Sequence, residues 1–162
     1  MDQTIRLLIV DDETRFLQAI ATRLAKRGFD VRTAESGEDA IELARHEKFD
    51  LALLDLRMPG MDGSEVLRAL KQEHKFLEAV ILTGHGSLAS AVELTKLGAY
   101  SYLPKPYELG RLIEILKEAY QARLQRKFKA DQEKLEKIMS IAKGESALGI
   151  LRKLRELDDG RK

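Results

Sequence analysis

Two apolar runs in this sequence end in aspartates whose positions could support chemistry. The run Ile5–Val10 is followed by Asp11 and Asp12, and the run Leu51–Leu54 is followed by Asp55. Such runs are typical of strands buried on both faces of a parallel sheet, and the carboxyl ends of these strands open into a crevice where ligands bind. Asp55 on its own would fit a helix cap or a turn better than a ligand site. The other aspartates change that interpretation.

Three carboxylates at one edge of a sheet repel one another unless a cation lies among them. Oxygen ligands without cysteine or clustered histidine favour a hard ion, and Mg²⁺ suits a site that also handles phosphate. Asp55 is then the candidate nucleophile for a phosphoryl group. Thr83 and Lys105 each follow a further predicted strand. At the same edge, Thr83 would donate its hydroxyl and Lys105 would pair with the transferred phosphoryl group.

The elements that must position these residues alternate along the chain. The expected strands are Ile5–Val10, Phe29–Thr33, Leu51–Leu54, Ala79–Leu82 and Tyr100–Leu103. The segments between them have apolar residues at helical spacing over about ten to fourteen residues. This alternation predicts a doubly wound parallel α/β sheet, and right-handed crossovers then bring all the strand ends to one side.

Composition limits the class of protein. A chain of 162 residues with 44% hydrophobic and 34% charged residues can form one domain and an appendage. It has no cysteine, so disulfides and thiolate metal sites are excluded. No apolar run approaches the roughly 18 residues of a membrane span, and we expect a cytoplasmic protein. Residues 122–162 hold 12 Lys and Arg against 7 Asp and Glu, so an acidic domain precedes a basic tail.

Residues 4–121 resemble the receiver domain of two-component response regulators. The matching stretches are Leu8–Glu13, Leu54–Gly63, Thr83–Gly86 and Gly98–Pro106. The resemblance implies a flavodoxin-like fold of five parallel strands in the order 2-1-3-4-5. It also implies that Asp55 accepts a phosphoryl group from a histidine kinase or a phosphotransfer protein.

The resemblance also implies roles for individual residues. It gives Asp11, Asp12, Asp55 and the backbone carbonyl of Arg57 as Mg²⁺ ligands, and it implies a cis Lys105–Pro106 bond. It further implies a switch in which Thr83 moves toward phosphorylated Asp55 and Tyr102 rotates inward, so that the surface of the fourth helix and fifth strand changes.

Two further side chains could control how long the phosphoryl group survives. Arg57 lies two residues after Asp55, and His85 lies two residues after Thr83. Both could overhang the phosphoryl group and govern the approach of hydrolytic water. They could equally be solvated loop residues.

A phosphatase of the haloacid dehalogenase type is the alternative from a different class. It also uses a nucleophilic aspartate, Mg²⁺ and a lysine on an α/β sheet. That family expects a second aspartate two residues after the nucleophile as general acid, and this sequence has Arg57 there. The sequence therefore favours a phosphoryl acceptor over a turnover enzyme.

Residues 122–162 form the predicted helical extension. A narrow apolar stripe continues the last helix of the domain to about residue 143, Gly144 breaks it, and a short amphipathic helix is expected over about 146–157. A helix of this length cannot bury such a stripe alone, so we expect a homodimeric coiled coil or a helical protein partner. Basic residues such as Arg123 and Arg126 suggest a minimal DNA-binding tail as an alternative. One short helix after the break is, however, too little for a helix-turn-helix unit.

Overall fold

The computed structural model describes residues 4–56, 63–84, 88–143 and 147–160, and for Thr83, Leu88, Ser90 and Ala147 it describes the backbone only. The chain divides into two compact units, Met1–Arg123 and Leu124–Lys162. The division lies two residues after the predicted boundary at 121/122, which stays a prediction.

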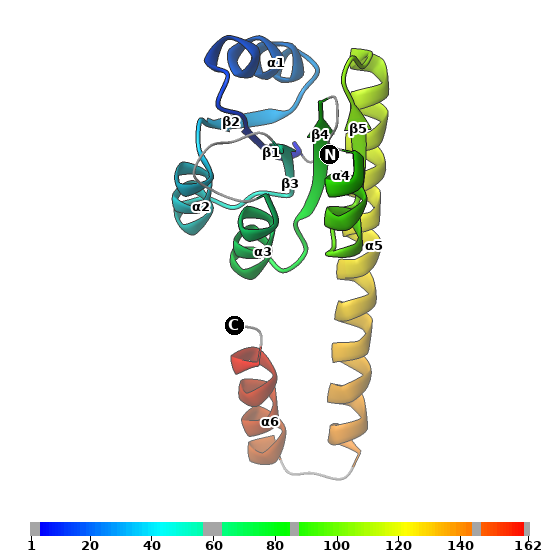
Figure 1. Cartoon of the computed structure of the whole chain (residues 1–162). Helices are drawn as coiled ribbons and strands as arrows, with labels where there is room; N and C mark the ends of the chain where they lie inside the picture. Colours follow the sequence, from blue (N-terminus) through cyan, green and yellow to red (C-terminus); the bar gives the residue numbers. More distant parts are fainter. Residues whose placement is uncertain (1–3, 57–62, 85–87, 144–146, 161–162) are drawn as a thin grey trace. The chain divides into compact units, whose positions relative to one another are not determined.

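The first unit contains one five-stranded sheet (Figure 1). Its strands are β1 (Arg6–Val10), β2 (Asp30–Ala34), β3 (Leu51–Asp55), β4 (Glu78–Thr83) and β5 (Ser101–Pro104). All neighbouring strands are parallel, and their order is β2-β1-β3-β4-β5. The predicted fold class and strand order are therefore confirmed.

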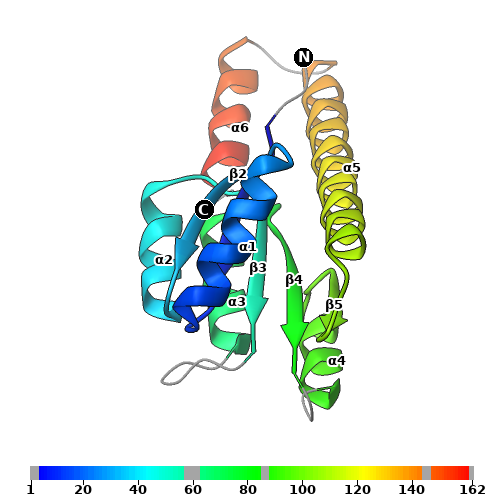
Figure 2. The same cartoon turned by 90° about the horizontal axis from the view of Figure 1, so that it is seen from above.

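Helices cover both faces of this sheet (Figures 1 and 2). The helices of the chain are α1 (Thr14–Lys26), α2 (Gly37–His46), α3 (Gly63–Glu73), α4 (Leu88–Lys96), α5 (Leu109–Ala142) and α6 (Ala147–Asp159). Alternate strand residues point to opposite faces. Leu7 and Ile9 of β1 pack with α1 and α5, whereas Leu8 and Val10 pack with α2, α3 and α4.

Local sequence explains where several helices begin and end. The Ser36 hydroxyl accepts a hydrogen bond from the backbone N–H of Asp39 at 3.1 Å and caps α2. Gly28 and Gly98 follow α1 and α4 with φ angles of +96° and +116°, which other residues rarely adopt. Gly28 and Gly98 thus end these two helices and allow the short connections that lead into β2 and β5.

Buried Asp50 joins three segments at the end of the sheet opposite the predicted site. It precedes β3 and is 4% exposed. Its carboxylate accepts hydrogen bonds from the backbone N–H of Arg6 at 2.9 Å and from the Arg6 guanidinium at 3.1 Å. The Arg123 guanidinium of α5 lies 3.2 Å from the same carboxylate. Asp50 therefore ties α5 to β1 and β3.

The second unit consists of the C-terminal part of α5 and the antiparallel helix α6 (Figure 1). An ion pair between Lys134 and Asp158 at 2.6 Å joins the two helices. Ile141 of α5 and Leu157 of α6 line one cleft, and Ile150 and Leu154 of α6 are half-buried. The predicted long last helix and short final helix are thus present, while the predicted break at Gly144 lies outside the described residues.

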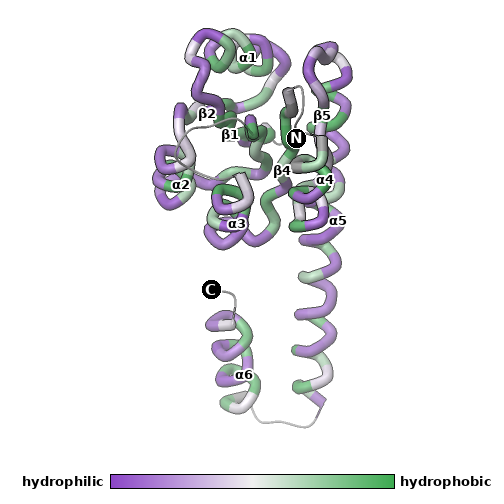
Figure 3. Tube along the Cα trace, in the orientation of Figure 1, coloured by the Kyte–Doolittle hydropathy of each residue, from purple (hydrophilic) through white to green (hydrophobic). Residues whose placement is uncertain are grey.

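The hydropathy of the residues agrees with their positions in the fold. Hydrophobic residues concentrate on the central strands, and the outer helices alternate between hydrophilic and hydrophobic positions (Figure 3). None of the described helices combines the length and apolar character needed to cross a membrane.

Candidate functional site

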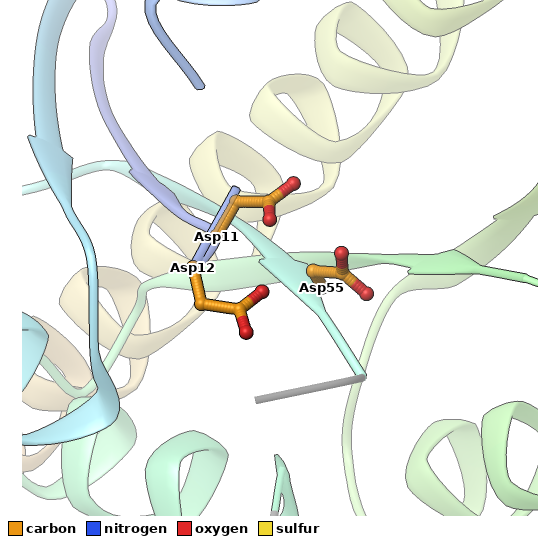
Figure 4. A group of neighbouring side chains, drawn as sticks. All are labelled: Asp11, Asp12 and Asp55. Carbon is orange, nitrogen blue, oxygen red and sulfur yellow. The ribbon is translucent and has the colours of Figure 1, made fainter. Parts of the chain in front are cut away.

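Three aspartates meet at the carboxyl ends of β1 and β3 (Figure 4). Val10 pairs with Leu54 in the parallel register, so the residues that follow these two are brought side by side. Asp11, Asp12 and Asp55 each offer a carboxylate oxygen, and these oxygens lie within 4.8 Å of one another. The convergence expected from the sequence is therefore present.

The three carboxylates differ in their surroundings. Asp11 is 1% exposed and Asp55 is 5% exposed, whereas Asp12 is exposed. Asp11 Oδ1 accepts a hydrogen bond from the Glu13 backbone N–H at 2.9 Å, and buried Asp11 Oδ2 has no hydrogen-bond partner among the described residues. Burial is the main cause that raises the pKa of Asp11 to about 6. The hydrogen bond from Glu13 and the charge of Lys105 lower this pKa, and the charge of Asp55 raises it further.

Lys105 supplies a positive charge to this cluster. Its Nζ lies 3.2 Å from Asp55 Oδ2 and is partly buried. The residue follows β5, and the Lys105–Pro106 bond is cis. Lys105 Nζ also lies 4.7 Å from the centroid of the Phe16 ring on α1, within the range of a cation–π interaction. Lys105 is therefore held between an aromatic face and the Asp55 carboxylate.

Sequence reasoning missed the roles of Phe16 and Tyr107. Phe16 has the helical spacing of a core residue, and only the return of the chain after β5 brings Lys105 above it. Burial, together with the charges of Asp11 and Asp55, raises the pKa of Tyr107 to about 12. Tyr107 stays neutral at physiological pH and lines a cleft of about 400 Å³ beside the site, together with Phe16, Ala19, Ile20, Arg23, Lys105, Pro106 and Leu109.

The other predicted site residues are described in part. The Thr83 backbone ends β4 opposite Pro104 of β5, but its side chain lies outside what the structure describes. Arg57 and His85 both lie outside the described residues. Tyr102 is half-buried against the face of the sheet covered by α2, α3 and α4, whereas Tyr100, which precedes β5, packs on the opposite face.

The donor set fits a divalent cation. Three carboxylates surround the site, and Asp11 presents a buried oxygen that no described donor satisfies. Oxygen donors of this kind suit a hard ion, and a cation would offset both the mutual repulsion and the missing hydrogen bond. The arrangement can therefore hold a metal ion directly beside the Asp55 carboxylate.

Removing the Asp11 charge should stabilise the metal-free protein. Because the folded-state pKa of about 6 exceeds the ordinary value of 3.8, the folded state binds more protons between these values, and stability falls as pH rises through this window. A shift of about two units corresponds to about 3 kcal/mol. We expect Asp11→Asn to raise the free energy of unfolding by about 2 to 3 kcal/mol near neutral pH.

Urea unfolding in the presence of a chelator, followed by circular dichroism at several pH values, measures this difference. The gain should shrink as pH falls through this window and vanish only below 3.8, where the Asp11 carboxyl is largely protonated in both folded and unfolded states. A gain that is the same at all pH values would show that the charge of Asp11 is not its cause.

A doubly wound five-stranded sheet with an acidic cluster at β1 and β3 and a lysine after β5 defines the receiver class of signalling domains. Residues 7–117 match the sequence model of the response regulator receiver domain. The chain belongs to this family of two-component response regulators. Receiver domains of the family bind Mg²⁺ at an acidic pocket, and this chain has an aspartate cluster of that kind.

Named relatives agree with the assignment. The chain is 37% identical over 113 residues to the transcriptional regulatory protein GlrR of Escherichia coli (strain K12), covering 70% of this chain and 26% of that protein. It is 35% identical over 111 residues to the DNA-binding transcriptional regulator NtrC of the same strain, covering 68% and 24%. The chain thus spans about a quarter of the length of these curated relatives.

A solved structure also resembles this chain closely. The CheY-like receiver domain protein from Methanospirillum hungatei JF-1 superposes with a TM-score of 0.71 at 30% identity. The match covers 76% of this chain and 99% of that one. Nearly all of that structure therefore corresponds to the receiver domain of the present chain.

Proposed function

We propose that this chain is a phosphorylation-controlled switch that accepts a phosphoryl group on Asp55 from a histidine kinase or a phosphotransfer protein. The observation that carries the proposal is the 3.2 Å contact between Lys105 Nζ and Asp55 Oδ2 beside the carboxylates of Asp11 and Asp12. A nucleophilic carboxylate needs nearby positive charge, because the incoming phosphoryl group is itself an anion.

The transfer is a single displacement at phosphorus. An Asp55 carboxylate oxygen forms the new P–O bond while the P–N bond to the donor histidine breaks, and the donor imidazole takes up a proton as it leaves. Lys105 donates a charge-assisted hydrogen bond to the phosphoryl oxygens. Mg²⁺, held by Asp11, Asp12, Asp55 and the Arg57 backbone carbonyl, would neutralise charge on the transferring group. The low exposure of Asp55 limits access of competing water.

The switch couples Asp55 to the surface around β5. The Thr83 hydroxyl hydrogen-bonds the new phosphoryl group, and Tyr102 moves into the space that Thr83 vacates. Tyr102 already packs partly against the core beneath α4, so a small rotation changes the surface formed by α4, β5 and the first turns of α5. The helical tail carries this change to a second copy of the chain or to another protein.

Acetyl phosphate tests the proposal without a cognate kinase. The protein is incubated with this donor in the presence of Mg²⁺ or a chelator, and intact mass and peptide mapping locate any phosphoryl group. We expect a stable adduct of one phosphoryl group on Asp55 that requires Mg²⁺. Steady release of inorganic phosphate without an accumulated adduct would instead support the phosphatase alternative.

Arg57→Ala should change the lifetime of phosphorylated Asp55. Arg57 lies two residues after the acceptor, where its side chain would influence the approach of hydrolytic water. We expect a change of about threefold or more in the first-order rate of phosphate loss after the donor is removed. His85→Ala provides the companion measurement. Rates equal to that of the wild type in both variants would remove this role.

A further inference from the structure

The second unit exposes an unusual share of large apolar side chains. Seven such side chains are exposed among the described residues, and five of them lie in the unit Leu124–Lys162. They are Phe128, Leu135 and Met139 on α5, and Leu148 and Leu151 on α6, with exposed fractions from 56% to 79%. A two-helix unit with this surface is incomplete as an isolated structure.

The residues of α5 that contact α6 show which side of α5 is turned toward α6. Lys134 pairs with Asp158, Ile141 lines a cleft with Leu157 of α6, and Ile138 is half-buried between them. Successive residues advance by about 100° around a helix. Leu135 follows Lys134 and Met139 follows Ile138, so both exposed residues lie about a quarter turn from the α6-facing side.

The same relation holds for α6. Leu157 lines the cleft with Ile141, and the half-buried residues Ile150 and Leu154 lie seven and three residues before it, on the same side of α6. The exposed residues Leu151 and Arg155 each follow one of these two. The helices α5 and α6 are antiparallel. In both helices, the residue that follows a contact residue therefore points to the same side of the helix pair. Leu135 and Met139 of α5 and Leu151 of α6 therefore form one face, called here the hairpin face.

Charges border the hairpin face on its two outer edges. Glu136 lies beyond Leu135 at the outer edge of α5, and Arg155 lies at the outer edge of α6. Neither makes an ion pair with another described residue. Since Lys134 is level with Asp158, Glu136 is level with residue 156, within about 1.5 Å of the height of Arg155. One edge is acidic and the other is basic at the same height.

We infer that the hairpin face binds the hairpin face of a second copy of this chain to form a four-helix bundle. With the two-fold axis along the helices, α5 of one copy packs on α6 of the other, and Glu136 meets Arg155 of the other copy twice. With the axis across the helices at this height, each helix packs on its own copy and Arg155 approaches Arg155. The charges therefore favour the first arrangement.

This inference deepens the proposed role of the tail and rests on that part of the proposed function. The inference does not require that Asp55 be phosphorylated. Labelling with acetyl phosphate tests phosphoryl acceptance separately from dimerisation. A chain that accepts phosphate but remains monomeric would overturn the inference alone.

A charge exchange tests the interface in the full chain. Sedimentation equilibrium measures the dimer dissociation constant for the wild type, Glu136→Arg, Arg155→Glu and the variant with both substitutions. We expect each single substitution to weaken the dimer about tenfold or more, and the double variant to return to within about threefold of the wild type. Glu133→Arg is the matched control, because it makes the same charge change two residues before Leu135, on the opposite side of α5, and should leave the dimer unchanged.

Cross-linking distinguishes the two arrangements. Because the chain has no cysteine, Glu136→Cys and Arg155→Cys each introduce a single thiol for a short bismaleimide reagent. A covalent dimer should form when the two variants are mixed and not when Arg155→Cys is treated alone. Cross-linking of Arg155→Cys alone would overturn the proposed arrangement. A monomer at all concentrations, with helix content unchanged by circular dichroism, would overturn the hairpin-face dimer itself.

Discussion

Asp55→Asn is expected to abolish phosphoryl acceptance. The amide has no anionic oxygen to attack phosphorus, and the remaining acids cannot replace it. Asp11 has one oxygen occupied by the Glu13 N–H and has a raised pKa, and among the described residues neither Asp11 nor Asp12 has a lysine contact comparable to that of Asp55 with Lys105. We expect incorporation from acetyl phosphate to fall at least about 100-fold, measured by intact mass.

The fold of this variant should remain intact, which separates lost chemistry from lost structure. Replacing one of three neighbouring carboxylates by an amide removes repulsion, so the melting temperature in chelator should not fall. Asp39→Asn makes the same chemical change at an exposed position in the first turn of α2 and should label like the wild type. Mg²⁺-dependent labelling of Asp55→Asn at the wild-type level would show that another residue is the acceptor.

Most of the site follows from the sequence because strand ends carry positional information. An apolar run stops where the sheet stops, so the acids after β1 and β3 had to share one edge once the parallel order was inferred. The pairing of Val10 with Leu54 realises that expectation. Boundaries shifted by a residue at several strands without altering which residues meet.

The sequence alone does not predict the contacts that long side chains make between helices and strands distant along the chain. Phe16 has the spacing of a core residue, and its position under Lys105 depends on the path of the chain after β5. Arg123 belongs to the basic tail in the sequence, but its side chain is only 14% exposed and it pairs with Asp50. Local sequence cannot distinguish a basic residue on a solvated helix face from one that reaches a buried acid.

That buried acid leads to the largest expected loss of stability, for Asp50→Ala. The substitution would leave the Arg6 backbone N–H without its acceptor at 2.9 Å and the Arg123 guanidinium without its carboxylate at 3.2 Å. Arg123 Nε is already buried without a hydrogen-bond partner among the described residues, so the charge would be poorly compensated. Breaking a buried pair from one side costs about 3 to 5 kcal/mol, a large part of the stability of a typical domain.

Urea unfolding monitored by circular dichroism should show this loss as a lower midpoint. Asp30→Ala is the matched control, because Asp30 pairs with Arg32 at a similar distance of 3.2 Å but is 48% exposed, and its loss should cost less than about 1 kcal/mol. Adding Arg123→Leu to Asp50→Ala should recover part of the loss, because the second substitution removes the uncompensated charge. Equal effects of Asp50→Ala and Asp30→Ala would mean that burial of the pair does not determine its contribution, and α5 would then be held to the sheet by its apolar contacts alone.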